Sequence, residues 1–191
     1  MADGTTQNSG EELSAAQQAL ATLWESHLAS EFETKSAPEA IGTMVPDAYV
    51  NHMPVLTGGA GHEDLLQFYS THFIPKMPPD VEIVPISRTI GSDQLVDEFV
   101  FRFTHTVEMD WMLPGIPPTG KRVEVPFVAI IRFRGDKLEH EHIYWDQASV
   151  LVQLGLIDPD GLPIVGAESA RKALDASLPS NELIRRADAA G

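Results

Sequence analysis

The chain contains no cysteine. Disulfide bonds, thiolate nucleophiles and cysteine ligands for zinc are therefore excluded, and the redox compartment stays open. With 191 residues the chain is long enough to bury a hydrophobic core without such cross-links. We therefore expect one ordinary domain with tails, whose chemistry rests on other residue types.

Basic residues are few. Lysine and arginine number 13 against 28 aspartates and glutamates, which gives a formal net charge of −15. A surface this acidic repels phosphate groups, so nucleic acids and anionic membranes are disfavoured as partners. A small neutral or apolar ligand fits this charge better.

Targeting and cofactor signals are also missing. The N-terminal sequence MADGTTQNSGEEL is polar and acidic, and no later segment is long and apolar enough to span a membrane. We therefore expect a cytoplasmic protein without a membrane partner. The sequence has no Gly-x-Ser-x-Gly elbow, no phosphate-binding glycine loop and no dinucleotide fingerprint. Any catalysis is expected to need no cofactor.

The first half of the sequence has helical periodicity. Ser9 with Glu12 forms a capping-box pattern before a helix that extends to about Leu28, and Ser36 with Pro38 opens a short second helix. A short strand at residues 49–52 and a glycine-rich loop at 57–61 precede a third helix, expected over residues 62–73. Residues 1–8 have no apolar periodicity and are expected to form a disordered tail.

The second half changes to the alternating pattern of β-strands. Four strands are expected, over residues 81–89, 94–107, 122–134 and 138–148. About three helices followed by these strands predict an α+β fold, in which a cone-shaped curved antiparallel sheet packs against the N-terminal helices and encloses a pocket. This domain would comprise residues 9–158, and residues 159–191 would form an extension with a short helix from about Glu168. The proline- and glycine-rich segment 109–121 could form a lid.

A tight turn at Gly135-Asp136 joins the last two strands and sets their expected register. If Arg134 lies opposite Lys137 and the strands are regular, alternation places His142 on the same sheet face as Phe127. This face would meet the helices and line the pocket, and its other members are Ala129, Ile131, Phe133, Leu138, His140, Tyr144 and Asp146. The opposite face, available to the partner in a homodimer, would carry Glu139, Glu141, Ile143 and Trp145.

These elements, together with four short motifs, resemble one protein family. The motifs are Thr104-His105, Pro118-Thr119-Gly120-Lys121, Gly135-Asp136-Lys137-Leu138 and Asp146…Gln153-Leu154-Gly155. In their order and spacing, residues 13–158 are similar to the SnoaL-like polyketide cyclase branch of the nuclear transport factor 2-like superfamily. The resemblance implies a cone-shaped α+β barrel with an internal pocket, commonly dimeric through the sheet. The relatives include polyketide cyclases, ketosteroid isomerase and dehydratases, so the resemblance implies no single reaction.

In the cyclases, an acidic residue on a pocket-facing strand does the acid–base work, but the segment 126–134 of this chain holds no acid. Four other residues are candidates: His105, Asp146, His142 and Glu98. His105 could act as a general base because the usual pKa of histidine, about 6.5, lies near working pH. Asp146 could orient an imidazole. The alternative is a structural role in a hydrogen-bonded polar pocket, which we favour over a metal site because two strand histidines and a distant carboxylate are a weak metal pattern.

Further residues are candidates for substrate binding. A histidine at a strand end could face the pocket mouth, and aromatic residues at alternating spacing could form pocket wall or plain core. These candidates are Tyr49, His52, Phe68, Trp111, Phe127 and Tyr144.

The sequence therefore predicts a cofactor-independent acid–base enzyme of the isomerase, cyclase or dehydratase type. Its substrate would be a small hydrophobic carbonyl compound, because an apolar pocket excludes water and strengthens the effect of a few polar groups. Two alternatives stay open. One is a non-catalytic module for small-ligand binding or dimerisation, and the other is a lactone or epoxide hydrolase in which Asp146 or Glu141 activates water.

Overall fold

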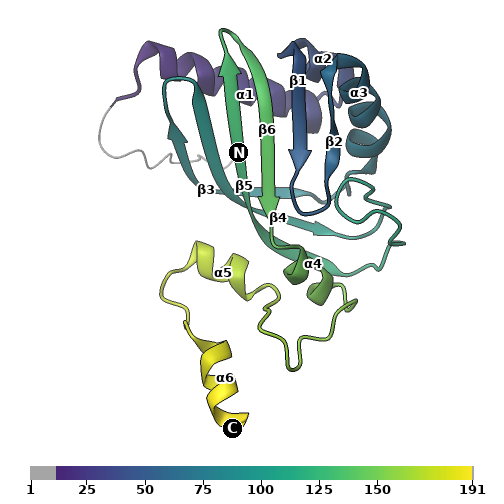
Figure 1. The fold of residues 1–191 in the computed structure, drawn as a ribbon, viewed down its shortest axis with the longest axis vertical. Coiled ribbons are helices and arrows are strands. Elements are labelled where there is room, and N and C mark those ends of the chain that lie inside the picture. Colours follow the sequence, from purple (N-terminus) through teal and green to yellow (C-terminus); the bar gives the residue numbers. More distant parts are fainter. Residues whose placement is uncertain (1–11, 191) are drawn as a thin grey trace.

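A curved six-stranded sheet is the centre of the computed structural model, which describes residues 12–190 (Figure 1). The predicted tail at residues 1–8 lies outside the described residues. The strands are β1 (Met44–His52), β2 (Thr57–Ala60), β3 (Glu82–Ile90), β4 (Gln94–Thr104), β5 (Arg122–Arg134) and β6 (Lys137–Trp145), and their order in the sheet is β2-β1-β6-β5-β4-β3. The strands β1 and β6 are parallel, and all other neighbours are antiparallel. The α+β class is confirmed, but the sheet is mixed rather than wholly antiparallel.

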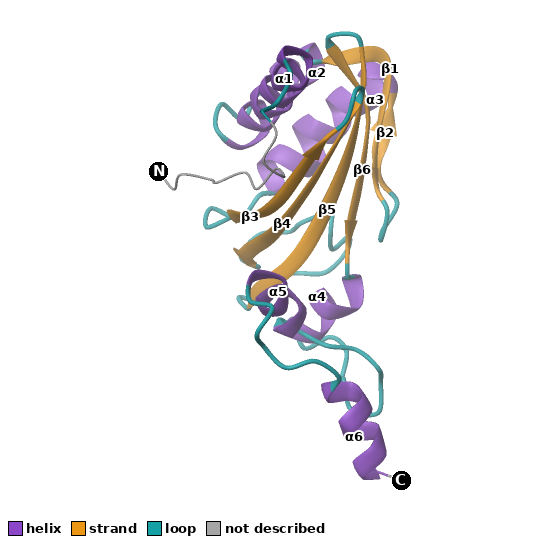
Figure 2. Cartoon of the chain, turned by 90° about the vertical axis from the view of Figure 1, so that its left-hand side faces the viewer, coloured by secondary structure: helices purple, strands orange, loops and turns teal. Residues whose placement is uncertain are grey.

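Three helices from the first half of the chain pack against this sheet (Figure 2). They are α1 (Ala15–Phe32), α2 (Ala37–Gly42) and α3 (Gly61–Gln67). The first begins at Ala15, where Ser14 and Gln17 form a capping box, whereas the predicted cap Ser9 lies outside the described residues. The second begins after Ser36 as predicted, since the Ser36 hydroxyl accepts a hydrogen bond from the backbone N–H of Glu39.

The hairpin of β5 and β6 turns at Gly135, whose φ of 64° suits a residue without a side chain. Arg134 lies opposite Lys137 as predicted, but a β-bulge follows. Phe133 pairs with Leu138 and Arg132 pairs with His140, so Glu139 has no partner on β5.

This one extra residue moves every later side chain of β6 to the other face. Glu141 and Ile143 are buried toward the helices, whereas His142 and Tyr144 face outward. The predicted faces of the last strand are therefore wrong from His140 onward. The prediction for β5 is right, because its alternate residues from Val123 to Phe133 are buried.

The segment between β4 and β5 is not a lid over the pocket. Four of its apolar residues are almost completely buried in the core, and these are Met109, Trp111, Met112 and Leu113. Apolar side chains of this size gain more from joining the core than from covering a solvent-filled opening.

The chain continues beyond the sheet in three short helices. They are α4 (Gln147–Gln153), which the sequence did not predict, α5 (Glu168–Leu174), close to its predicted start, and α6 (Glu182–Ala190). The helix α5 contacts β5, whereas α6 points away from the body of the molecule (Figures 1 and 2). Among residues 12–190, no helix has the length and apolar character needed to cross a membrane.

Candidate functional site

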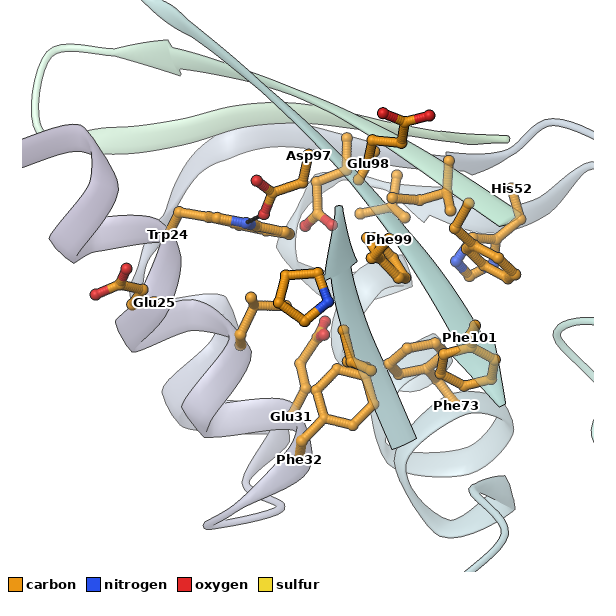
Figure 3. Close-up of a pocket in the computed structure, with 18 of the residues that line it drawn as sticks. Trp24, Glu25, Glu31, Phe32, His52, Phe73, Asp97, Glu98, Phe99 and Phe101 are labelled. Carbon is orange, nitrogen blue, oxygen red and sulfur yellow. Dashed lines mark hydrogen bonds between the residues drawn. The ribbon is translucent and has the colours of Figure 1, made fainter. Parts of the chain in front are cut away.

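A cavity of about 390 Å³ lies between α1, the end of α3 and the concave face of the sheet. Aromatic side chains form a large part of its wall, and several of them are labelled in Figure 3; these residues are Trp24, Phe32, Phe68, Tyr69, Phe73, Phe99, Phe101, Trp111 and Phe127. Such a wall excludes water, and it binds flat apolar ligands through area and ring stacking.

One wall depends on a local irregularity of the backbone. After α3, residues Phe68–Phe73 form a π-helical turn before a short 3-10 turn at Ile74–Lys76. The wider turn brings Phe68 and Phe73 together, with ring centres 5.8 Å apart, and Tyr69 is buried beside them. Single π-helical turns are frequent at functional sites, and this one directs three aromatic side chains into the cavity.

The floor of the cavity holds a buried polar cluster formed by His27, Glu31, Tyr69 and Glu141. Nε2 of His27 lies 3.1 Å from Oε1 of Glu31 and 3.1 Å from Oε1 of Glu141. The Tyr69 hydroxyl donates a hydrogen bond of 3.2 Å to Oε1 of Glu141 and lies 3.3 Å from Nε2 of His27. Helix α1 therefore meets strand β6 through charged groups that are almost completely buried.

The contacts of His27 define its protonation. The Thr43 hydroxyl donates to the carbonyl of Ala40, so it accepts a hydrogen bond from Nδ1–H of His27, at 2.7 Å. Burial lowers the pKa of His27, but the carboxylates of Glu141 and Glu31 outweigh this effect and raise the pKa to about 10. At neutral pH the ring is therefore an imidazolium, with one N–H directed at Thr43 and the other at the two carboxylates.

Burial also affects the other members of the cluster. It raises the pKa of the Glu31 carboxyl, against the opposing effect of the His27 cation. Burial and the Glu141 charge raise the pKa of Tyr69 well above its usual value, so this hydroxyl stays protonated and can donate. Glu141 receives the Tyr69 hydrogen bond on Oε1, while its Oε2 has no hydrogen bond from the described residues and is not sealed by protein atoms. This free oxygen belongs to a side chain that lines the cavity.

The ligand atoms of His27, Glu31 and Glu141 lie within 4.8 Å of one another, close enough to share a metal ion. Without a metal ion, the raised pKa of His27, about 10, keeps a proton on Nε2 between the two carboxyl groups at neutral pH.

His52 contributes a second polar group to the cavity wall. The Thr57 hydroxyl donates to the carbonyl of Trp111, so it accepts from Nδ1–H of His52 at 3.1 Å. Burial lowers the pKa of His52 to about 4, so the ring is neutral and Nε2 carries a lone pair. No described residue bonds to Nε2, and it is not sealed by protein atoms. It can accept a hydrogen bond from a ligand.

An ion pair holds the other end of the cavity together. The guanidinium of Arg88 binds both carboxylate oxygens of Asp97, at 2.6 and 2.8 Å, and the Trp24 indole N–H donates to Oδ2 at 2.7 Å. Asp97 is thereby fully engaged, and it connects β4 to α1 and β3. The exposed Glu25 completes the group by an ion pair of 2.9 Å with Arg88.

The structure brings part of the predicted site together. The cavity is lined by His52, Phe68, Trp111, Phe127 and Glu98. The Glu98 carboxylate, however, points away from the aromatic walls and accepts a hydrogen bond from Ser87, so it does not address the interior (Figure 3).

Three predicted residues lie on the outer face of the sheet instead. His142 and Tyr49 contact each other there with ring centres 5.5 Å apart, and His140 stacks on both. Tyr144 is 40% exposed. The placement of His142 and Tyr144 in the pocket was wrong because of the bulge at Glu139.

His105 and Asp146 also lie outside the cavity lining. His105 is fully buried, and its Nδ1 accepts a hydrogen bond from the backbone N–H of Thr119. Burial lowers its pKa. Asp146 is the N-cap of α4, and its carboxylate accepts a hydrogen bond from the backbone N–H of Ser149. This carboxylate was expected to orient an imidazole, but it caps the helix instead.

Sequence reasoning missed the floor cluster as a site. His27 and Glu31 have the four-residue spacing that places two side chains on one helical face, and Tyr69 lies within the range expected for the third helix. These sequence patterns alone indicate only which side chains share a helical face, and they do not indicate a functional site. Glu141 could be assigned to this cluster only once the register of β6 was known.

Comparison with known proteins defines the class. A sequence model of the SnoaL-like polyketide cyclase family matches residues 15–154. Because this is most of the chain, the protein belongs to that family. A comparison with curated proteins finds no match.

Solved structures show the same fold. A SnoaL-like polyketide cyclase candidate from Jannaschia sp. CCS1 has a TM-score of 0.59 and 19% identity, covering 78% of this chain and 100% of that one. A protein with a ketosteroid isomerase-like fold from Catenulispora acidiphila DSM 44928, in complex with trimethylamine, has a TM-score of 0.54 and 18% identity, covering 74% and 97%. AclR, a hydroxylase candidate from Streptomyces galilaeus, has a TM-score of 0.57 and 20% identity, covering 74% and 99%. At these identities the likeness extends to the fold.

Proposed function

We propose that the protein is a cofactor-independent acid–base enzyme of the isomerase, cyclase or dehydratase type. Its substrate is a small hydrophobic carbonyl compound bound in the aromatic cavity. The observation that carries this proposal is the free Oε2 of Glu141 at the floor of an apolar cavity, with hydrogen-bond donors fixed on the other oxygen. Membership in the SnoaL-like polyketide cyclase family supports the reaction class.

Glu141 acts as the base in this proposal. Its Oε2 removes a proton from the carbon next to the substrate carbonyl, while Tyr69 and His27 hold Oε1. The electron pair of the broken C–H bond moves to the carbonyl oxygen and gives an enolate. The Tyr69 hydroxyl can turn from Glu141 to that oxygen, and burial keeps it protonated for this purpose.

The fate of the enolate decides the reaction. If Glu141 returns its proton to another carbon, the result is isomerisation. If the enolate attacks a second carbonyl of the same molecule, a ring closes, and if it expels a hydroxyl group, the Glu141 proton leaves with it as water. The neutral His52 accepts a hydrogen bond from the substrate through Nε2 and orients it.

Proton abstraction can be tested before the natural substrate is identified. Alkyl aryl ketones such as 3,3-dimethyl-1-phenylbutan-1-one carry exchangeable protons beside the carbonyl, and NMR in deuterated buffer follows their exchange. We expect the protein to accelerate exchange and Glu141→Gln to lower the rate by about a hundredfold or more. Glu139→Gln on the same strand is the matched control and should keep the rate. Equal exchange rates in the Glu141→Gln variant and the unchanged protein would refute the role of Glu141.

Two other functions use the same cavity. A binding module would take up ketones without accelerating exchange, so the same experiment separates it from an enzyme. A lactone or epoxide hydrolase would use Glu141 to activate water, and the raised pKa of Glu31 would suit this residue as the acid. Product formation from a panel of epoxides and lactones would test that function.

We also propose that the protein is a homodimer through the sheet. Ile143 and Trp145, which were predicted on the outer face, are buried on the inner one. The residues on the outer face are Tyr49, Val128, Ile130, His140, His142 and Tyr144. Light scattering at micromolar concentration should give the mass of two chains, and Ile130→Glu should give one. A monomer in the unchanged protein contradicts the proposal.

A further inference from the structure

The charges around the cavity are unbalanced. Its lining includes five carboxylates, from Glu25, Glu31, Asp97, Glu98 and Glu141, but one arginine, Arg88. Arg88 is occupied by Asp97 and Glu25, and Glu98 points outward. In the part of the chain that the structure describes, the floor therefore keeps two carboxyl groups, Glu31 and Glu141, against the single His27 cation.

The floor lacks one positive charge for full compensation. The raised pKa of Glu31 agrees with this, because burial of a carboxyl without a cation of its own disfavours the charged form. The pKa of His27 reflects the same excess of negative charge, since the two glutamates raise it to about 10 despite complete burial. A cationic ligand would supply the missing charge.

Unused acceptors face the same space. His27 takes Oε1 of Glu31 and of Glu141, and among residues 12–190 no hydrogen bond reaches Oε2 of either carboxyl. Neither of these oxygens is sealed by protein atoms, and both side chains line the cavity. Two free carboxylate oxygens in an apolar cavity are a recognition element for a positive group.

The walls favour the same kind of ligand. The faces of Phe and Trp rings attract cations, and ammonium groups are commonly bound in aromatic enclosures. Phe68, Phe73 and Trp111 form one wall, with Phe73 and Trp111 5.2 Å apart. Phe99 stacks on Phe127, and Phe101 packs against it at a tilt, to form another wall, with ring centres 5.4 and 5.1 Å from that of Phe127.

We propose that the ligand of this cavity is a hydrophobic carbonyl compound that carries an ammonium group. The ammonium group lies over the carboxylates of Glu31 and Glu141 and against the aromatic wall. The same charges reject ligands with a carboxylate or phosphate. This inference rests on the proposed function for the carbonyl and adds the charge of the substrate.

A pair of ketones that differ in charge alone tests the proposal. Phenacyltrimethylammonium and 3,3-dimethyl-1-phenylbutan-1-one have the same shape, because a quaternary nitrogen in the first replaces a carbon in the second. 3-Benzoylpropionate supplies the anion. Binding to the full chain at low ionic strength is measured by titration calorimetry or by quenching of tryptophan fluorescence. We expect the cation to bind at least about tenfold more tightly than the neutral ketone, and the anion to bind least.

Two variants locate the charge preference. Glu31→Gln and Glu141→Gln should each bring the two isosteric ketones to within about threefold of one another. Glu33→Gln removes a charge from the exposed surface just after the same helix and should leave the preference unchanged. If either floor variant fails to fold, the ketone pair still decides the question on the unchanged protein.

Three results overturn the proposal: equal or tighter binding of the neutral ketone, no binding of the cation at millimolar concentration, or a preference that survives in both floor variants. None of them bears on deuterium exchange. A protein that exchanges neutral ketones without preferring the cation keeps the proposed function and loses this inference. A protein that prefers the cation without exchange keeps the ligand class and loses the enzyme.

Discussion

The His27 imidazole on α1 lies 3.1 Å from the Glu141 carboxylate on β6, where His27 is fully buried and Glu141 is 3% exposed. Trp24 covers the imidazolium from the other side as a stacked ring, with centres 5.6 Å apart. The contact joins the first helix to the last strand of the sheet, and it depends on one proton. The stability of the fold should therefore depend on that proton.

We expect the protein to lose stability as pH rises from 7 to 9. The pKa of His27 is about 10 in the folded state and about 6.5 in the unfolded chain, so the folded state binds more protons between these values. The stabilisation is fully present below pH 6.5 and is lost as pH rises through 10. Melting temperatures across this range should fall in the unchanged protein.

The loss should be smaller in His27→Gln, which has no proton to release. His72→Gln, at a partly exposed histidine, is the matched control and should follow the unchanged protein. If His27→Gln and the unchanged protein lose stability equally between pH 7 and 9, the imidazolium is not the source.

A second histidine should limit stability on the acid side. Burial lowers the pKa of His52 to about 4, so below pH 6.5 the unfolded chain binds a proton that the folded state does not. Between pH 7 and pH 5 we expect urea denaturation to show a loss on the order of 1–2 kcal/mol from this group. His52→Phe should remove most of it, and Thr57 keeps its own bond to the Trp111 carbonyl. An unchanged acid slope in His52→Phe would assign the loss to other groups.

Much of the fold follows from local sequence. Ser36 begins α2 through its hydroxyl, and alternation with Gly135 gave β5 its bounds and its buried face. These features depend on neighbours in the chain. The pairing of β1 with β6 is parallel and joins distant segments, so no short pattern could indicate it.

The prediction of the candidate site was wrong because of a single residue, Glu139. Both faces of β6 carry ionisable and aromatic side chains, so the sequence alone could not show which face is the inner one. Nothing in the sequence around Glu139 indicates a bulge. His27 and Glu31 were accessible from helical spacing, but their meaning required Glu141 on the inner face. A register error of one residue therefore exchanged Glu141 for His142 in the predicted site.

The bulge itself can be tested by deletion. Removing Glu139 makes β6 regular and leaves every later residue on its present face. The deletion removes partly exposed ion pairs to Arg132 and Arg134, which should cost about 0–1 kcal/mol of unfolding free energy. Deleting His142 instead would turn Ile143 and Trp145 out of the core and should prevent folding. Equal damage from the two deletions, seen by circular dichroism and thermal melting, would argue against this register.

Asp146, which the sequence predicted to be catalytic, lies at the start of α4. Its Oδ1 accepts from the backbone N–H of Ser149 at 3.1 Å. Asp146→Ala should therefore cost about 0.5–2 kcal/mol in unfolding free energy, whereas Asp146→Asn should cost little, because asparagine caps helices as well as aspartate does. Deuterium exchange of aryl ketones per folded molecule should be the same in both variants. A fall in the exchange rate of about a hundredfold in Asp146→Asn, with the melting temperature unchanged, would show that Asp146 takes part in the reaction.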